Sequence, residues 1–301
     1  MSFRLDHHEA TSQGIRRIAL EGLDAAVAQL QDHGSDHNQA VHDARKRLKE
    51  LRALLRLVRG SLGKANYKRE NRCFRDAGRR LAAARDAQVL RSTFDALRKQ
   101  AEGIPGEALE RISATLAARH GAALDEDAVA EVVPVLKAAR ERITTLSIQK
   151  DGWTALEGGL SEVYRRGRRS LAKAAKHPSD ETFHDWRKQV KYLWHGLQVL
   201  EPLWPEVLER SAEESHKLAD LLGDDHDLAV LEQTLRGEPE SFTDGATLEA
   251  LSTLIAARRY YLQAEAKRLG ARLYAEKPRA FVRRHEKYWR AWQELPGVRS
   301  Q

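Results

Sequence analysis

The chain has 301 residues, of which 32% are charged and 42% hydrophobic, and its formal net charge at pH 7 is +7. It is long enough to bury a real core, and its single cysteine, Cys73, excludes an internal disulfide. The positive charge favours polyanionic partners or an anionic membrane surface. No signal-peptide pattern opens the sequence and no apolar run approaches the roughly 18 residues of a membrane span. We therefore expect a cytoplasmic protein that does not insert into a membrane.

Almost every stretch of the sequence favours helix. Alanine, leucine, arginine, glutamate and lysine dominate, and no convincing period-two strand pattern is found. Helix-breaking residues divide the chain at intervals of about 15 to 30 residues, a length suited to bundle helices. We expect breaks at residues 34–35, 60–63, 103–106, 121, 152, 177–179, 202–205, 223, 237–239, 245 and 278. Asp36, and Ser179 or Asp180, are placed to cap the helices that follow them. The prediction is an all-α protein.

One segment of the sequence occurs twice. Residues 41–49 (VHDARKRLK) and 183–191 (FHDWRKQVK) share the order apolar-His-Asp-x-Arg-Lys-x-apolar-Lys, and each opens a long helical pattern. Residues 81–90 and 222–231 correspond more loosely. The repeat predicts two homologous antiparallel helical bundles, residues 1–148 and 149–301, placed side by side.

Each repeated helix is expected to have one apolar and one cationic face. At about 100° per residue, a single arc of about 80° in the first helix holds His42, Arg45, Lys49, Arg52 and Arg56. The corresponding arc of the second helix holds His184, Arg187, Lys191 and His195, with Lys188 at its edge. Trp194 and Gln198 stand there in place of the last two arginines. The residues expected to face the core are Val41, Leu48, Leu51, Leu55 and Val58, and Phe183, Trp186, Val190, Leu193, Leu197 and Leu200.

Basic residues on a helix usually form a solvated surface, and that is one interpretation of these arcs. However, the arc from His42 to Arg56 contains no acidic residue, whereas ordinary surface helices mix both signs. An anionic ligand that neutralises the charge is therefore expected, and arginine forks suit phosphate oxygens. The histidine that leads each arc would contact this ligand as imidazolium or as a neutral N–H donor. Affinity would then rise as pH falls.

Acidic residues near the motifs leave a catalytic alternative open. Asp43 and Asp185 follow the histidines. A carboxylate in a first helical turn is expected to suit the helix dipole, or to pair with Lys46, Arg47, Lys188 or an arginine of the other bundle.

The run Asp224 to Asp227 has His216 and Asp220 nearby and resembles a metal-binding cluster. It also follows Gly223, where we expect one helix to end and the next to begin. Capping carboxylates would explain the run at such a position.

The paired His-Asp-x-Arg-Lys helices and the segment from Leu81 to Leu90, with its variant from Leu222 to Leu231, resemble the CHAD domain, the conserved histidine α-helical domain. The resemblance covers roughly residues 6–290. It implies two pseudo-symmetric helical bundles in one domain, which binds inorganic polyphosphate in a basic cavity between them and is targeted to polyphosphate granules. Many members carry a fused triphosphate-hydrolysing domain; its Glu-x-Glu-x-Lys signature does not occur here, which indicates a stand-alone member. His226 departs from the pattern, since the first copy has Arg85 there, and Ala82 and Ala83 replace a glycine-containing turn.

Together these observations predict a non-catalytic polyphosphate-binding protein that uses no cofactor and no metal. The predicted ligand-binding residues are His42, Arg45, Lys46, Lys49, Arg52, Arg56, Arg79, Arg85, Arg165, Arg169, His184, Arg187, Lys188, Lys191 and His226. Two alternatives stay open. The same charge favours a nucleic-acid-binding protein, although aromatic residues, which stack on single strands, make up only 6% of the chain. The run from Asp224 to Asp227 leaves a metal-dependent phosphohydrolase.

Overall fold

The computed structural model describes residues 3–32, 37–81, 83–120 and 126–294, without the side chains of residues 37, 83–87, 119–120 and 126. Within these ranges the chain forms helices and no strand, which confirms the all-α prediction. The helices are α1 (Thr11–Gln31), α2 (His37–Leu57), α3 (Arg59–Leu62), α4 (Lys64–Arg80), α5 (Ala83–Arg98), α6 (Gly106–His120), α7 (Glu126–Thr144), α8 (Trp153–Lys176), α9 (Asp180–Leu200), the 3-10 turn η1 (Glu201–Leu203), α10 (Pro205–Gly237), α11 (Pro239–Phe242), α12 (Gly245–Leu273) and α13 (Pro278–Glu294). None of the described helices is both long and apolar enough to span a membrane.

The two repeated segments lie in α2 and α9, and their predicted apolar faces are buried. Every residue expected in the core, from Val41 to Val58 and from Phe183 to Leu200, is less than 9% exposed. The start of α9 is fixed by Ser179, whose hydroxyl accepts a hydrogen bond from the Thr182 amide at 3.2 Å. The other predicted cap, Asp36, lies outside the described residues. The helical periodicity thus oriented both motif helices correctly.

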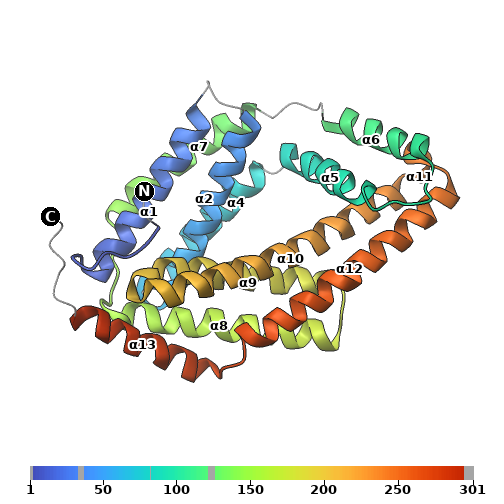
Figure 1. Cartoon of the computed structure of the whole chain (residues 1–301). Helices are drawn as coiled ribbons and strands as arrows, with labels where there is room; N and C mark the ends of the chain where they lie inside the picture. The colour runs from blue at the N-terminus through green and yellow to red at the C-terminus, as the bar shows by residue number, and fades with distance from the viewer. Residues whose placement is uncertain (1–2, 33–36, 82, 121–125, 295–301) are drawn as a thin grey trace.

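Helices of the two halves lie against one another (Figure 1). In the first half, α1, α2, α4 and α7 pack on one another; in the second, α8 packs on α9, α9 on α10, and α10 on α12. The motif helix α2 contacts both α8 and α9, so the larger hydrophobic cluster contains residues of both halves. The predicted boundary at residues 148 and 149 falls in the connection between α7 and α8. The division into two sequence repeats stays a prediction.

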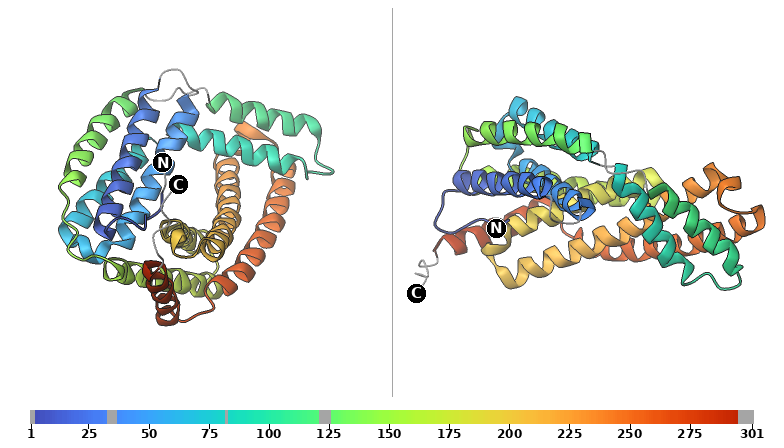
Figure 2. Two further views of the ribbon diagram at one scale, coloured as in Figure 1. Left: turned by 60° about the vertical axis from the view of Figure 1, so that its left-hand side comes forward. Right: turned by 90° about the horizontal axis from the view of Figure 1, so that it is seen from above.

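A second cluster joins α5 and α6 to helices of the other half. Phe94, Leu97 and Ile112 pack there with Leu231 of α10 and Leu251 of α12. Figures 1 and 2 show α5 and α6 at the ends of α10 and α12 that lie far from α1. Two helices of the first repeat therefore depend on the second repeat to cover their apolar faces.

Our expectation of a helix break at Gly223 is wrong. Helix α10 runs without interruption from Pro205 to Gly237, so Asp224 and its neighbours are interior helical residues rather than caps. A glycine inside a helix costs about 1 kcal/mol relative to alanine. Its position here is explained by packing, because a Cβ atom on Gly223 would lie 3.0 Å from Nη2 of Arg187 on α9. The missing side chain lets the Arg187 guanidinium lie against α10.

Candidate functional site

A pocket of about 220 Å³ lies between the two motif helices. It is lined by Lys49, Arg52, His184, Arg187, Lys188, Lys191, Tyr192 and His195. No carboxylate is among these lining residues, and five of the eight carry a positive charge. The pocket draws on both copies of the repeat because α2 packs directly on α9. It is therefore a concave cationic site that neither copy forms alone.

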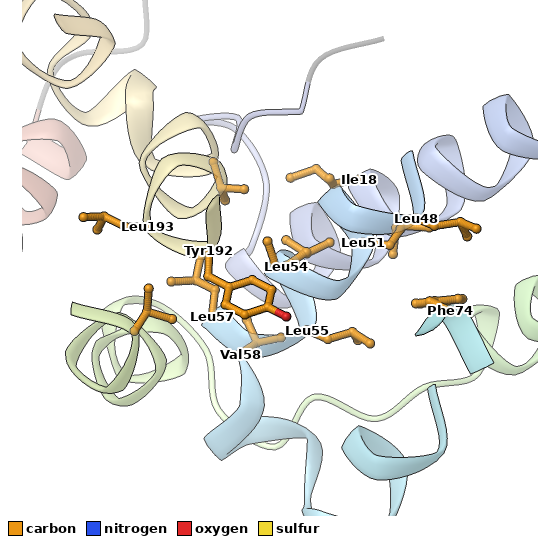
Figure 3. Close-up of a cluster of buried hydrophobic side chains, with 14 of the residues drawn as sticks. Ile18, Leu48, Leu51, Leu54, Leu55, Leu57, Val58, Phe74, Tyr192 and Leu193 are labelled. Carbon is orange, nitrogen blue, oxygen red and sulfur yellow. The ribbon is translucent and has the colours of Figure 1, made fainter. Parts of the chain in front are cut away.

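Tyr192 of α9 holds two arginines of α2. Its hydroxyl accepts a hydrogen bond from Nη2 of Arg52 at 3.4 Å, and the Arg56 guanidinium carbon lies 4.0 Å from the centre of its ring. Figure 3 shows Tyr192 against α2, beside Leu54, Leu57 and Val58. Burial lowers the pKa of Arg52 from its ordinary value, and the charge of Arg56 adds to the effect. The tyrosine thus fixes the end of the longer cationic arc.

Arg187 connects the pocket to α10. Its Nη1 lies 3.7 Å from Oδ1 of Asp227, and its guanidinium rests on Gly223. Within the described residues, its buried Nε has no hydrogen-bond acceptor. An anion in the pocket would supply one, and a buried N–H group left without an acceptor is costly.

His184, which lines the pocket, pairs with His226 of α10, which is not among the lining residues. Their ring centroids are 4.4 Å apart with an interplanar angle of 38°. The pKa of His184 is lowered to about 4, mainly by burial and then, in decreasing order of effect, by His226, Lys188 and Arg187. The pKa of His226 is also lowered, first by burial and then by Arg187. Both rings are accordingly neutral at pH 7 in the free protein.

His195 was expected on the cationic arc, but it is a core residue that reaches the pocket wall. It is 3% exposed, stacks on Trp194 with centroids 4.4 Å apart, and pairs through Nδ1 with Oε1 of Gln198 at 2.9 Å. Burial lowers its pKa to about 4, against the raising effect of the Gln198 bond. Lys191, Lys46 and Lys49 also contribute to this lowering of the pKa, and Lys49 and Lys191 line the same pocket as the His195 ring.

The remaining predicted residues of α2 and α4 extend the basic surface beyond the pocket. Arg45 donates from Nη1 to the Gly78 carbonyl at 2.7 Å and so ties α2 to α4. His42 is half-buried one turn before it, and Lys46 is exposed. Arg79 is exposed in the last turn of α4, where it helps lower the pKa of Asp76 after the larger effect of the hydrogen bond from Arg75.

Two predicted residues of α8 lie outside the lining of the pocket. Arg165 of α8 pairs with Glu162, and Arg169 is exposed on the same helix. Neither lines the pocket. Arg85 belongs to α5, and its side chain lies outside the described part of the structure.

The carboxylates that suggested catalysis have structural partners. Asp185 pairs with Lys188 at 2.5 Å, as expected, whereas Asp43 accepts hydrogen bonds from Gln39 at 3.1 Å. Asp225 is 1% exposed and accepts hydrogen bonds from Arg259 at 3.0 Å and Gln263 at 2.8 Å. Asp225 therefore anchors α10 to α12.

The described residues do not bring together a set of ligands for the metal site that the sequence left open. Because α10 is continuous, Asp225 faces α12 while Asp227 approaches Arg187. Among the residues that the structure describes, no group of three histidine, cysteine or acidic side chains is placed to hold a metal ion.

Sequence reasoning missed Tyr192 as a functional residue. Its position corresponds to Glu50 in the other repeat, and it falls just outside the cationic arc. The available signal was an aromatic residue directly after Lys191 in the motif, although only the contact of α2 with α9 shows which arginines it holds.

The comparisons agree with this architecture. The family model of the CHAD domain matches residues 21–236, which include α2, α9 and His226. A search of curated proteins finds no match. Because the match covers more than half of the 301 residues and contains both motif helices, the chain belongs to the CHAD domain family.

Proposed function

We propose that the pocket between α2 and α9 binds inorganic polyphosphate without catalysing a reaction. The observation that carries the proposal is the lining of the pocket: five cationic side chains and two imidazoles from both motif helices, with no carboxylate among them. Arginine and lysine donate charge-assisted hydrogen bonds to phosphate oxygens. A polymer with about one negative charge per phosphate would release counterions on binding, as other phosphate backbones do.

The site favours a phosphate chain over single-stranded nucleic acid. Proteins that bind single-stranded nucleic acid rely on exposed aromatic side chains on which the bases stack. The aromatic residue that lines the pocket, Tyr192, is 9% exposed and lies against the Arg56 guanidinium. A flexible phosphate polymer has no bases, so cationic side chains are sufficient to bind it. The proposal extends to attachment of the protein to polyphosphate granules through this pocket.

Binding without turnover is supported by the partners of the nearby carboxylates. Asp185 is paired with Lys188, and Asp225 is occupied by Arg259 and Gln263. A general base needs a carboxylate or imidazole within hydrogen-bonding reach of the attacking water. Asp185 is thus paired within α9, and Asp225 joins α10 to α12.

A competition titration in a series of salt concentrations tests the proposal. Long-chain polyphosphate should bind the protein, and log affinity should fall as log salt rises. The five cations of this pocket should contribute about 3 to 4 to the slope, if each counts at the single-strand value. Duplex and single-stranded DNA at equal phosphate concentration should compete weakly. Equal competition by DNA would contradict the proposal. So would Mg²⁺-dependent phosphate release that is lost on replacing Asp224 and Asp227 by asparagine.

Affinity for polyphosphate should increase as pH falls from about 8 towards 4. In the free protein, burial and nearby cations lower the pKa of His184 to about 4. A bound polyanion stabilises the imidazolium and raises that pKa, so the complex takes up a proton below its own pKa. For one histidine, affinity increases by at most about tenfold per pH unit. The increase ends near pH 4, where His184 is protonated in the free protein as well as in the complex.

Dissociation constants measured at constant salt between pH 5 and 8 would show this dependence. The doubly substituted protein His184→Gln, His226→Gln should lose it, because neither amide titrates in this range. A pH dependence that persists unchanged in this variant would show that the histidine pair is not responsible.

A further inference from the structure

A second basic groove lies between α8 and α13, away from the α2–α9 pocket. Its volume is about 850 Å³, and its lining includes Arg168 of α8, and Lys277, Arg279 and Arg283 at the start of α13. The two sites share no lining residue. Figures 1 and 2 show α8 between α9 and α13, and α8 packs on both of them. Helix α13 also lies beyond residues 21–236, to which the family match extends.

The four basic residues of this groove differ from their neighbours in having no ion-pair partner among the described residues. Nearby, Arg165 and Arg166 pair with Glu162, and Arg284 pairs with Glu276 at 2.7 Å. The groove contains two carboxylates, Glu157 and Glu286, and Glu286 pairs with Arg290 at 2.5 Å. Four basic side chains therefore share the groove with two carboxylates, one of which is already paired, so the groove keeps an excess of positive charge.

Stabilisation of α13 does not account for these charges. The first turn of α13 contains no acidic residue, and Lys277 and Arg279 flank its start. Cations there oppose the helix dipole, which favours negative charge at an N-terminus. The cations lower the stability of the free helix slightly, so their placement fits a ligand better than a packing role.

The walls of the groove are rigid. The Tyr164 hydroxyl donates hydrogen bonds to the carbonyl oxygens of Leu273 at 3.1 Å and Glu276 at 3.3 Å, in the turn before α13. Its ring stacks on Phe281, with centroids 3.9 Å apart and 12° between the planes. The turn and the first part of α13 are thus held against α8. A preorganised site loses less entropy when a ligand binds.

We infer that the groove between α8 and α13 is a second binding site for a linear phosphate polymer, which makes the protein bivalent towards long chains. Three of its four cations are arginines, whose planar forks match phosphate oxygens. No aromatic residue lines it, so it offers no surface on which a base could stack. The identity of the ligand rests on the proposed function of the first pocket. A chain that reaches both sites would bind about a hundredfold more tightly than a short one through effective concentration.

Calorimetry with a short oligophosphate tests the inference by stoichiometry, because each site should take up a molecule of its own. The wild-type protein should bind two oligophosphates. The variant Arg168→Glu, Arg279→Glu, Arg283→Glu should bind one, and its affinity for long-chain polyphosphate should fall about a hundredfold. These three side chains are exposed, so the variant should fold, and its thermal unfolding checks this. The variant with glutamine at the same three positions should also bind one oligophosphate. The control Lys99→Glu, Arg111→Glu, Lys137→Glu makes the same change in net charge at exposed residues outside both sites and should bind two.

The outcomes separate the two proposals. If the groove variant still binds two oligophosphates with unchanged affinity, the second site is refuted while the first survives. If Lys49→Glu, Lys191→Glu leaves the stoichiometry at two, the proposed function of the α2–α9 pocket fails. Binding of a polyglutamate peptide in the groove, with no binding of oligophosphate there, would also overturn the inference.

Discussion

Replacing both Lys49 and Lys191 by glutamate is expected to reduce affinity for long-chain polyphosphate about a hundredfold or more. Both side chains line the pocket, one from each motif helix. A hydrogen bond to a charged group contributes about 1.5–3 kcal/mol, so the loss of two phosphate contacts alone predicts this scale, and repulsion adds to it. Binding measured by fluorescence anisotropy at fixed salt would show the loss.

The same variant should not lose stability, which separates a binding effect from unfolding. Lys49 and Lys191 line the pocket together with three other cationic side chains and no carboxylate. A glutamate at either position would face positive neighbours and reduce their mutual repulsion. The thermal unfolding temperature should therefore stay level or rise. A matched control, Arg111→Glu with Lys137→Glu, changes net charge equally at exposed residues outside the pocket and should keep most of the affinity. Equal losses in the two variants would mean that net charge, rather than the pocket, determines binding.

Replacing Gly159 by alanine is expected to destabilise the protein by about 3 kcal/mol or more. A Cβ atom there would lie 1.8 Å from the Leu57 carbonyl oxygen and 2.6 Å from that of Arg56. These are backbone atoms, so α8 would have to move away from the end of α2. Overpacking of this kind commonly costs about 1–3 kcal/mol, and a clash with backbone belongs at or above the upper end. Denaturant unfolding followed by circular dichroism gives the free energy of unfolding directly.

The adjacent glycine supplies the control. A Cβ atom on Gly158 would meet nothing within 4 Å, and the residue lies in the same helix. Gly158→Ala should therefore stabilise the protein by up to about 1 kcal/mol through helix propensity. If Gly159→Ala unfolds at the same denaturant concentration as the wild type, α8 does not approach α2 closely enough to exclude a Cβ atom.

The positions and faces of the two motif helices could be predicted because both depend on local spacing. Apolar residues at intervals of three and four place Leu48 and Leu51, and likewise Val190 and Leu193, on one side of a helix. The cationic arc then follows on another side. Glycine gave a weaker signal: the glycine at 152 precedes α8, but the glycine at 223 lies inside α10. A glycine that allows close packing and one that ends a helix look alike in a single sequence.

The sequence by itself determined the helical class, the repeat and the charged face of each motif helix, since these follow from side chains a few residues apart. The tertiary structure decided that α2 meets α9, so that Arg52 and Arg56 are held by Tyr192 and the two short cationic rows become one pocket. It also decided that His184 is neutral at pH 7, because burial and then His226, which comes from the distant helix α10, lower its pKa. Helical periodicity depends on bonds within one turn, whereas desolvation and contacts between helices depend on which faces fill the same space.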